Sequence, residues 1–501
     1  MYLYTIIYTI NTNIAIYLQF KCIAKKYNDM VVRESVIQRL NEHLKSKKSE
    51  FIAITGRRRV GKTYIIDTVY ESHLCFRLTG IQNGTLNEQL VNFTQKLISY
   101  SQSTLITTPK NWQEAFILLK NYLLTLSKKK KHVLFIDELP WVNTVKSSFL
   151  QLLAHLWNDF LSKENNYILV VCGSSTSWIT KKIIRDKGGL HNRLTDIIRL
   201  KPFTIQETKA FLNYKGIHMT NQQVIETYMI MGGIPYYLND IRRGESIAVA
   251  AERMCFMDDG ILKSEYDNLY KALYDNPQDH EMIVTTLATS RTGLTRQEII
   301  NKSKVLAGGP YQRAMEDLLL SGFVTEEVTF GNKKKGSIYR LNDEYSIFYH
   351  RFIKSNKKYV SGIWLQISAS QTYKIWTGYA FENLIYNHIS TIKSALGIAS
   401  VFTEISAINV MGTKEKDGYQ IDLIIDRKDA TINICELKYY NAPFEIDKKY
   451  AEVLRNRKQK FIMHTGTRKQ VFTTMITNLG IIENPWSLEV IDKSLSFSDL
   501  L

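Results

Sequence analysis

The stretch FIAITGRRRVGKT, Phe51 to Thr63, decides the fold at the amino-terminal end of this 501-residue chain. Its first four residues, Phe51–Ile54, are apolar and predict a short buried strand. The strand leads into GRRRVGKT, Gly56 to Thr63, which fits the pattern G-x-x-x-x-G-K-[ST] at every fixed position. The order strand, glycine-rich loop and helix is the context in which this pattern marks a phosphate-binding loop.

The residue types of the loop match the binding of a nucleoside triphosphate. Gly56 and Gly61 let the backbone turn its N–H groups toward phosphate oxygens. Lys62 can reach the β- and γ-phosphates, Thr63 offers a hydroxyl to Mg²⁺, and a helix from Lys62 to about Glu71 would direct its dipole at the same anion. We therefore predict ATP and Mg²⁺ as ligands; the alternative is a glycine-rich turn with basic residues. The predicted nucleotide-binding residues are Gly56, Arg57, Arg58, Arg59, Val60, Gly61, Lys62 and Thr63.

A second nucleotide motif, HVLFIDE, runs from His132 to Glu138. Its apolar residues predict a strand that is buried on both faces of a parallel sheet. Asp137, at the carboxyl end of that strand, is expected to hold the water shell of Mg²⁺, and Glu138 is expected to act as the general base. Many buried strands end in an acidic residue, but this one follows the loop by about 75 residues, which favours the nucleotide function.

Two further features could take part in hydrolysis. The strand Tyr167–Cys172 ends in a turn whose Ser174 and Ser175 are candidates for sensing the γ-phosphate; the alternative is an ordinary strand-to-helix turn. Arg193, in the loop before the predicted strand Ile197–Leu200, could act as an arginine finger. The alternative for Arg193 is a solvated loop side chain.

Composition limits the class of protein. The chain carries a formal net charge of +17 and is 45% hydrophobic, which is ample for packed cores and makes a polyanionic partner such as DNA plausible. Its length predicts about three domains. The five cysteines are far apart and contain no CxxC pair, so they predict reduced thiols in a cytoplasmic protein and exclude a disulfide framework.

The first 29 residues form an unusual segment. Met1–Phe20 carries no charge, but Asn11, Thr12 and Asn13 interrupt it and it lacks a small-residue cleavage site. We predict a poorly ordered extension over residues 1–29 and no membrane attachment. The alternative is a membrane anchor.

The expected helices and strands indicate where the ATPase core ends and a helical lid begins. Residues 33–46 have apolar positions at helical spacing, a strand is expected near Cys75–Leu78, and residues 86–126 are expected to be largely helical with a break at Pro109. These elements predict an ATPase core over residues 30–203. An all-helical lid is expected over residues 204–275, starting at a capping box formed by Thr204 and Glu207.

Residues 276–355 predict a winged-helix domain. A capping box at Thr295 and Glu298 opens its second helix. The tip between its two strands carries Lys333–Lys335, which suits sequence-independent contacts to DNA phosphates. The alternative is a domain that only packs on the ATPase. Its expected elements are helices Glu281–Thr289, Thr295–Lys302 and Pro310–Ser321 and strands Phe323–Phe330 and Ser337–Leu341.

A second chemical site is predicted near the carboxyl terminus. Asp422 lies on an expected strand, and Glu436 and Lys438 lie on the next strand, two residues apart and so on one face. Asp422 and Glu436 could hold Mg²⁺, and Lys438 could orient a water for attack on a phosphodiester. The alternatives are a degenerate domain or a buried ion-pair network. A helix over residues 445–458 and a strand over residues 460–464 are expected to follow.

Five motifs in this order, GRRRVGKT, FIDELPW, CGSSTSW, PFT and GGIPYYL, resemble the archaeal and bacterial AAA-type ATPases that carry a DUF234-like carboxyl-terminal region. These ATPases are close to the STAND and Orc/Cdc6-like P-loop ATPases. The carboxyl-terminal hairpin resembles the PD-(D/E)xK nuclease superfamily, and Glu382 matches the upstream acidic residue of that superfamily. The chain departs from the pattern of the AAA-type ATPases at Val32, directly before Arg33 and Glu34, where that family usually has glycine.

The resemblance implies an α/β chain: a P-loop NTPase (AAA-type) parallel sheet core with a helical lid, a winged helix, and a restriction-endonuclease-like α/β domain over residues 370–501. It implies an Mg²⁺-dependent ATPase, associated with DNA, whose nuclease-like domain is regulated by the nucleotide state. The alternative function is a slow nucleotide switch that binds DNA or a protein partner without cutting. The oligomeric state stays open.

Overall fold

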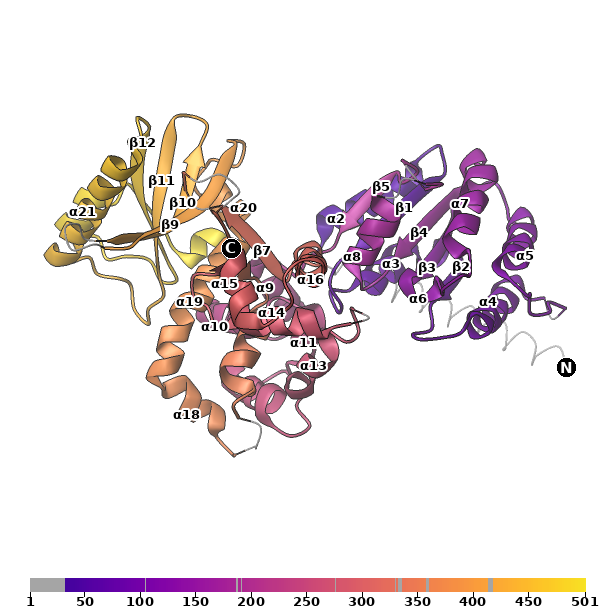
Figure 1. Ribbon diagram of the computed structural model, residues 1–501, viewed down its shortest axis with the longest axis horizontal. Coiled ribbons are helices and arrows are strands. Elements are labelled where there is room, and N and C mark those ends of the chain that lie inside the picture. Colours follow the sequence, from indigo (N-terminus) through magenta and orange to yellow (C-terminus); the bar gives the residue numbers. More distant parts are fainter. Residues whose placement is uncertain are drawn as a thin grey trace, which may run out of the picture. The chain divides into compact units, whose positions relative to one another are not determined.

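The structure is a computed structural model that describes residues 32–103, 105–185, 188–190, 192–274, 276–328, 330–331, 336–356, 360–412 and 418–501. The predicted extension over residues 1–29 and the predicted wing lysines Lys333–Lys335 lie outside these residues. The chain divides into two compact units, Met1–Pro202 and Phe203–Leu501, coloured from indigo to magenta and from magenta to yellow in Figure 1. Among the described residues, no helix combines the length and the apolar character needed to cross a membrane.

The first unit is built on a five-stranded sheet with the order β2-β3-β4-β1-β5, in which every pair of neighbouring strands is parallel. Strands β1, β3 and β4 are buried along their whole length, which explains their continuous apolar sequences. The predicted strands are confirmed. Their bounds are β1 Glu50–Thr55, β2 Leu74–Thr79, β3 His132–Asp137, β4 Tyr167–Cys172 and β5 Asp196–Arg199.

Helices surround this sheet, as Figure 1 shows. The predicted helices over residues 33–46 and 86–126 are confirmed, and the second is divided around Pro109 as expected. Trp112 and Phe149 meet edge to face with ring centroids 4.7 Å apart at the centre of the apolar core. The helices are α2 Glu34–Lys45, α3 Lys62–Tyr70, α4 Leu86–Ser101, α5 Trp112–Leu124, α6 Leu139–Val142, α7 Phe149–Asp159 and α8 Thr176–Ile179.

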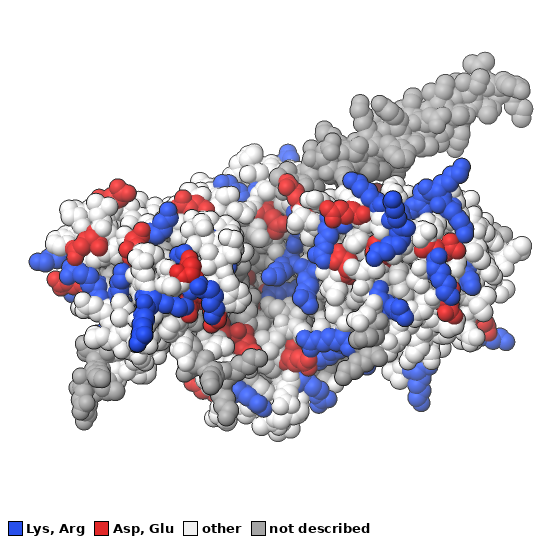
Figure 2. All heavy atoms as spheres, turned by 90° about the horizontal axis from the view of Figure 1, so that it is seen from above, with Lys and Arg blue, Asp and Glu red and all other residues white. Residues whose placement is uncertain are grey.

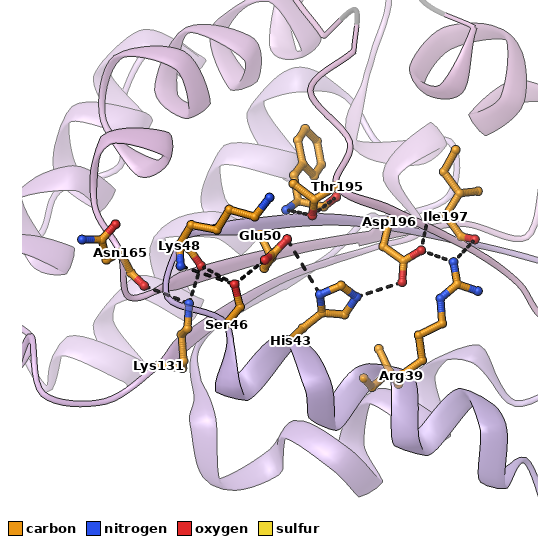
Figure 3. A network of polar contacts seen from close by, with 12 residues as sticks. Arg39, His43, Ser46, Lys48, Glu50, Lys131, Asn165, Thr195, Asp196 and Ile197 are labelled. Atoms are coloured by element: carbon orange, nitrogen blue, oxygen red, sulfur yellow. Dashed lines mark hydrogen bonds and ion pairs between the residues drawn. The ribbon is translucent and has the colours of Figure 1, made fainter.

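A network of polar contacts ties α2 to the amino ends of β1 and β5 (Figure 3). The His43 ring lies between two carboxylates, with Nε2 2.8 Å from Asp196 Oδ2 and Nδ1 3.8 Å from Glu50 Oε2. Arg39 pairs with the same Asp196. Because the phosphate loop leaves the carboxyl end of β1, this network lies at the opposite edge of the sheet and has a structural role.

The second unit begins with helices. The capping box predicted at Thr204 is confirmed: Glu207 N–H donates to Thr204 Oγ1 over 3.1 Å, and Thr204 N–H donates to Glu207 Oε2 over 2.9 Å. The helices are α9 Ile205–Tyr214, α10 Asn221–Met231, α11 Pro235–Asp240, α12 Ile247–Ala251 and α13 Ile261–Leu269.

A three-stranded antiparallel sheet with the order β6-β8-β7 follows. The capping box predicted at Thr295 and Glu298 is present, and the observed elements follow one another in the order expected for residues 276–355. Their bounds are α14 Gln278–Ala288, β6 Leu294–Thr295, α15 Arg296–Ser303, α16 Gly309–Leu320, β7 Val324–Val328 and β8 Ser337–Leu341.

The last part of the second unit is a five-stranded mixed sheet with the order β13-β12-β11-β10-β9. β10 pairs antiparallel with both β9 and β11, and β11 pairs parallel with β12. The predicted hairpin of β10 and β11 is confirmed. The strands are β9 Thr403–Val410, β10 Tyr419–Arg427, β11 Thr431–Lys438, β12 Gln470–Thr477 and β13 Lys493–Leu495. The helices are α17 Glu344–Phe348, α18 Ile363–Ala369, α19 Gln371–Asn387, α20 Ile389–Ala395, α21 Lys448–Thr465 and α22 Pro485–Val490.

The strand predicted over residues 460–464 is wrong, because these residues belong to α21. A short apolar run does not by itself distinguish a strand from one face of a helix. Here Phe461 is buried in the core while Met463 is exposed, and the helix ends only at Gly466, whose φ of 61° is left-handed. The expected strand begins later, at Gln470.

Candidate nucleotide site and a buried acidic site

The loop between β1 and α3 has a backbone that depends on its glycines. Gly56 has a φ of 154°, and a Cβ there would lie 2.2 Å from the carbonyl oxygen of Leu200. Gly61 has a φ of 88° and immediately precedes α3. Because larger residues avoid these conformations, the two fixed glycines of the motif are explained by the geometry.

Lys62 points back into this loop. Its Nζ donates hydrogen bonds to the carbonyl oxygens of Gly56 and Arg57, each over 2.9 Å, and the side chain is buried. Burial lowers the pKa of Lys62, and the acidic side chains Asp137 and Glu138 oppose that shift. The ammonium group therefore has two hydrogen bonds inside the loop that phosphate oxygens of a nucleotide can replace.

Thr63 and Asp137, predicted from separate motifs, meet at the carboxyl edge of the sheet. Thr63 Oγ1 donates to Asp137 Oδ2 over 2.9 Å. Cys172 Sγ donates to the other carboxylate oxygen over 2.7 Å, and burial followed by the charge of Asp137 raises the pKa of this thiol well above its usual range. A hydroxyl beside a carboxylate is a donor set that fits Mg²⁺, so Thr63 and Asp137 would hold this ion. When bound, Mg²⁺ would neutralise charge on the phosphate oxygens.

Glu138 lies directly after β3 in a left-handed conformation with a φ of 47°. Its carboxylate accepts hydrogen bonds from Ser174, one from the backbone N–H over 2.9 Å and one from the hydroxyl. The structure therefore brings together the candidate base and one of the two candidate sensors. Ser175 instead occupies the N-cap position of α8, where its side chain makes no capping hydrogen bond.

Arg193 is exposed in a turn before β5. None of the contacts found among the described residues joins its side chain to Lys62 or Asp137, so the arginine finger stays a prediction. Two other arginines, which sequence reasoning missed, approach the loop and Asp137. Buried Arg33 donates to the carbonyl oxygen of Val60, and Arg77 lies 3.7 Å from Asp137 Oδ2. A charged residue inside the apolar strand β2 was the signal for Arg77.

The second predicted site also assembles. Lys438 Nζ lies 2.8 Å from Glu436 Oε1, and the backbone N–H of Leu437 donates to Asp422 Oδ2 over 3.3 Å. Burial and then the negative charge of Glu436 raise the pKa of Asp422 to about 6. On α19, burial and then the charge of Asp422 raise the pKa of Glu382 to about 8. Closely spaced buried carboxylates of this kind often mark functional sites.

Asp422 lies at an irregularity of its strand. The register between β9 and β10 shifts between Ile421 and Ile424, so β10 contains a bulge at this point. Tyr386 of α19 donates its hydroxyl to the backbone carbonyl oxygen of Asp422 over 2.7 Å. Bulges of this kind redirect a side chain and occur beside active sites. Tyr386 therefore helps to position Asp422 beside Glu436.

Glu436 has partners that the sequence did not indicate. Tyr450 of α21 donates its hydroxyl to Oε1 over 2.7 Å, and Arg457 of the same helix pairs with Oε2. Burial opposes ionisation, but the charges of Lys438 and Arg457 outweigh it, so the pKa of Glu436 is below its usual range. Arg457 belongs to a basic run over residues 455–460, for which the sequence favours equally a contact with the DNA backbone and a solvated helix end. The structure places its side chain on Glu436.

The donor set at this site fits Mg²⁺ in part. Carboxylate oxygens are ligands that Mg²⁺ accepts, but both oxygens of Glu436 already have partners. Among the described residues, no group of three or more His, Cys, Asp or Glu side chains has the arrangement of a metal site. Asp422 and Glu436 would hold Mg²⁺ only if Arg457 moved aside.

Comparison with known proteins supports the first unit's class. Residues 30–241 match the model of a family described as an ATPase domain predominantly from Archaea. The match covers less than half of the chain and, with the loop geometry above, supports a P-loop ATPase domain with an α/β fold.

Three individual proteins are also similar to the chain. An uncharacterized protein of Methanocaldococcus jannaschii is 24% identical over 435 residues, covering 85% of this chain and 92% of that protein. A Walker-type ATPase of Pyrococcus abyssi is 17% identical with a TM-score of 0.48, covering 64% of this chain and 95% of that one. The ORC2 protein of Aeropyrum pernix, solved in complexes with ADPNP and ADP, is 13% identical with a TM-score of 0.40. The match covers 67% of this chain and 94% of that one.

The raised pKa of Glu382 predicts a pH dependence of stability. The carboxyl keeps its proton up to a pH of about 8 in the folded chain but loses it near 4.5 when unfolded, so its contribution to stability is lost as the pH rises between these values. Glu382→Gln should remove this loss and raise the free energy of unfolding at pH 9 by roughly 5 kcal/mol relative to wild type. Urea unfolding at pH 5 and pH 9 measures the difference. Equal pH dependence in Glu382→Gln and in the exposed control Glu452→Gln would contradict it.

Proposed function

We propose that this protein is a DNA-associated, Mg²⁺-dependent ATPase whose carboxyl-terminal domain cleaves phosphodiester bonds under control of the nucleotide state. The observation that carries the proposal is the meeting of Asp422, Glu436 and Lys438 on one hairpin, beside the buried acid Glu382. Asp422 and Glu436 would hold Mg²⁺, which supplies Lewis-acid chemistry when bound. Lys438 would orient the attacking water.

In the first unit, we assign the nucleotide to the loop Gly56–Thr63. Lys62 would bind the β- and γ-phosphates, Thr63 and Asp137 would hold Mg²⁺, and Glu138 would accept the proton of the attacking water. The hydrogen bonds of Lys62 inside the loop and the contact between Thr63 and Asp137 support these roles. A helical lid over residues 204–275 would respond to the bound nucleotide.

The contact of Glu138 with Ser174 yields a prediction. Ser174→Ala removes the hydrogen bond from the hydroxyl and keeps the one from the backbone N–H, so it should loosen the hold on Glu138 and raise basal ATP hydrolysis about three- to tenfold, the effect of roughly 1 kcal/mol. Steady-state release of phosphate measures the rate, and Ser175→Ala is the matched control. A fall in turnover with unchanged ATP affinity would contradict this restraint and favour γ-phosphate sensing by Ser174.

DNA association rests on charge and on the proposed winged helix of residues 276–355. The chain has a net charge of +17, which favours a polyanion. Figure 2 shows basic and acidic side chains interspersed on the face that it draws. Part of the basic run on α21 is also neutralised, since Arg455 pairs with Glu489 and Lys458 with Asp492. The contact with DNA is therefore expected to be local and sensitive to salt.

The test is cleavage of plasmid and linear DNA by the full chain with Mg²⁺ or Mn²⁺, with and without ATP. Wild type should nick or linearise the plasmid, and Asp422→Asn should not, while both hydrolyse ATP at the same rate. Absence of cleavage by wild type under every condition, with ATP still hydrolysed, would overturn the nuclease function and leave the ATPase.

One observation favours a second function. Both oxygens of Glu436 are engaged by Lys438, Tyr450 and Arg457, which is the arrangement of a buried ion-pair network. The protein would then be a slow nucleotide switch that binds DNA or a protein partner without cutting. In that case wild type and Asp422→Asn should bind labelled DNA equally, with an affinity that differs between ATP and ADP.

A further inference from the structure

Asp137 presents its two carboxylate oxygens to different partners. Oδ1 accepts the Cys172 thiol over 2.7 Å and the backbone N–H of Glu138 over 3.0 Å. Oδ2 accepts the hydroxyl of Thr63 over 2.9 Å. Because two protein donors already occupy Oδ1, Oδ2 is the oxygen that would hold a divalent cation together with Thr63.

Arg77 of β2 approaches the same oxygen. Its Nη2 lies 3.7 Å from Asp137 Oδ2, and its Nη1 donates to Oδ1 of Asp67 over 2.8 Å. One guanidinium group is thus shared between two carboxylates, and the fork shape of arginine allows both contacts at once. The shorter contact is with Asp67, so this carboxylate holds the guanidinium more tightly than Asp137 does.

The sequence spacing explains why these side chains meet. Thr63 and Asp67 are four residues apart on α3 and therefore share one face of that helix. Phe135 and Asp137 are two residues apart on β3 and share one face of the sheet, and Arg77 is the register partner of Phe135. The guanidinium carbon of Arg77 lies 5.2 Å from the centre of the Phe135 ring, a cation–π contact that keeps the positive charge over β3.

Burial makes the charge of Arg77 effective at Asp137. The side chain of Asp137 is 6% exposed and that of Arg77 is 28% exposed, whereas that of Asp67 is 41% exposed. Charges interact more strongly where water is excluded. Arg77 therefore neutralises part of the charge of Asp137, and the same positive charge would repel a divalent cation held at Oδ2.

We propose that Arg77 competes with Mg²⁺ for Asp137, and that Asp67 is a positioning residue that sets the affinity for Mg²⁺ by holding Arg77 away from that carboxylate. When Asp67 loses its charge, Arg77 pairs with Asp137 and closes the metal position. When Arg77 loses its charge, both carboxylates keep their negative charge and attract a divalent cation more strongly. The inference rests on the proposed assignment of Mg²⁺ to Thr63 and Asp137, and it adds two residues that lie outside both nucleotide motifs.

The two residues form one ion pair, but the proposal gives them opposite effects on metal binding. If the pair only stabilised the packing of α3 on β2, the loss of either partner would break the same contact and would change metal binding in the same direction. Opposite changes therefore distinguish competition for Asp137 from a structural role of the pair.

The test measures how much Mg²⁺ adds to nucleotide binding by the full chain. The affinity for a fluorescent, non-hydrolysable ATP analogue is measured in Mg²⁺ and in EDTA, and by linkage the ratio of the two affinities follows the affinity of the nucleotide complex for Mg²⁺. Arg77→Gln should raise this ratio about tenfold, and Asp67→Asn should lower it about tenfold. The exposed controls Lys96→Gln and Glu42→Gln, which make the same changes of charge in the same unit, should leave the ratio unchanged.

A second pair of variants, Arg77→Met and Asp67→Ala, should shift the ratio in the same two directions, and circular dichroism shows that each variant is folded. The inference is overturned if the Arg77 and Asp67 variants shift the ratio in one direction, or if neither shifts it by more than about twofold. Equal affinity of wild type for the analogue in Mg²⁺ and in EDTA would instead overturn the assignment of Mg²⁺ to Thr63 and Asp137, and this inference with it.

Discussion

Lys62→Ala is expected to abolish ATP hydrolysis and to weaken ATP binding about a hundredfold. Lys62 is buried in the loop, and its ammonium group already points at the carbonyl oxygens of Gly56 and Arg57 rather than into solvent. Alanine removes the positive charge that, in the proposed assignment, would face the β- and γ-phosphates, and charge-assisted hydrogen bonds in a buried site are worth roughly 1.5–3 kcal/mol each. Calorimetric titration with ATP and steady-state phosphate release measure the two effects.

The control for Lys62→Ala is Lys96→Ala, which removes an exposed lysine from α4 of the same unit. Lys96→Ala should retain the wild-type rate and affinity. Hydrolysis by Lys62→Ala at more than about a tenth of the wild-type rate would contradict the assignment of this loop, since each tenfold of rate corresponds to about 1.4 kcal/mol.

Lys438→Ala is expected to abolish DNA cleavage while leaving ATP hydrolysis unchanged. Lys438 lies 2.8 Å from Glu436, and the charge of that carboxylate raises the pKa of Lys438 although burial opposes the shift. The lysine is therefore cationic at neutral pH and can orient a water or stabilise a developing charge on phosphate. Its loss should lower the cleavage rate at least about a hundredfold, measured on supercoiled plasmid under single-turnover conditions.

Two variants make this result specific. Lys458→Ala, which removes another basic side chain of the same domain, should cleave at the wild-type rate if DNA contact there is weak. Lys438→Arg keeps the positive charge but changes the shape of the side chain. DNA cleavage by Lys438→Arg at a rate between those of Lys438→Ala and wild type would indicate an electrostatic role for Lys438. Cleavage by Lys438→Ala at the wild-type rate would show that the activity does not use this hairpin. Unchanged ATP hydrolysis shows that the variant chain is folded in its first unit.

Much of the fold could be predicted because its signals are local. Buried strands such as β1 and β4 are continuous apolar runs, and the capping boxes at Thr204 and Thr295 fix helix starts within four residues. The one wrong element, the strand over residues 460–464, has apolar residues that also fit a helix, and the stop signal lies beyond it at Gly466.

The candidate sites were predicted less completely, for a related reason. Lys62 and Thr63 follow from the loop itself, but the contacts of Glu138 with Ser174 and of Cys172 with Asp137 join residues 35 or 36 positions apart. Such contacts depend on the order of strands in the sheet, where β3 and β4 are neighbours. No local pattern of residues carries that order.

By itself, the sequence determined the phosphate loop, the acidic end of β3 and the hairpin of Asp422, Glu436 and Lys438, since glycine backbone freedom and the two-residue period of a strand act over a few residues. Only the tertiary structure decided the state of the acidic site. Tyr450 and Arg457 reach Glu436 from positions 14 and 21 residues away, and packing of α19 on the hairpin buries Glu382 and raises its pKa. Burial and long-range charge depend on the packed fold, and they determine whether these carboxylates are paired or can bind a metal ion.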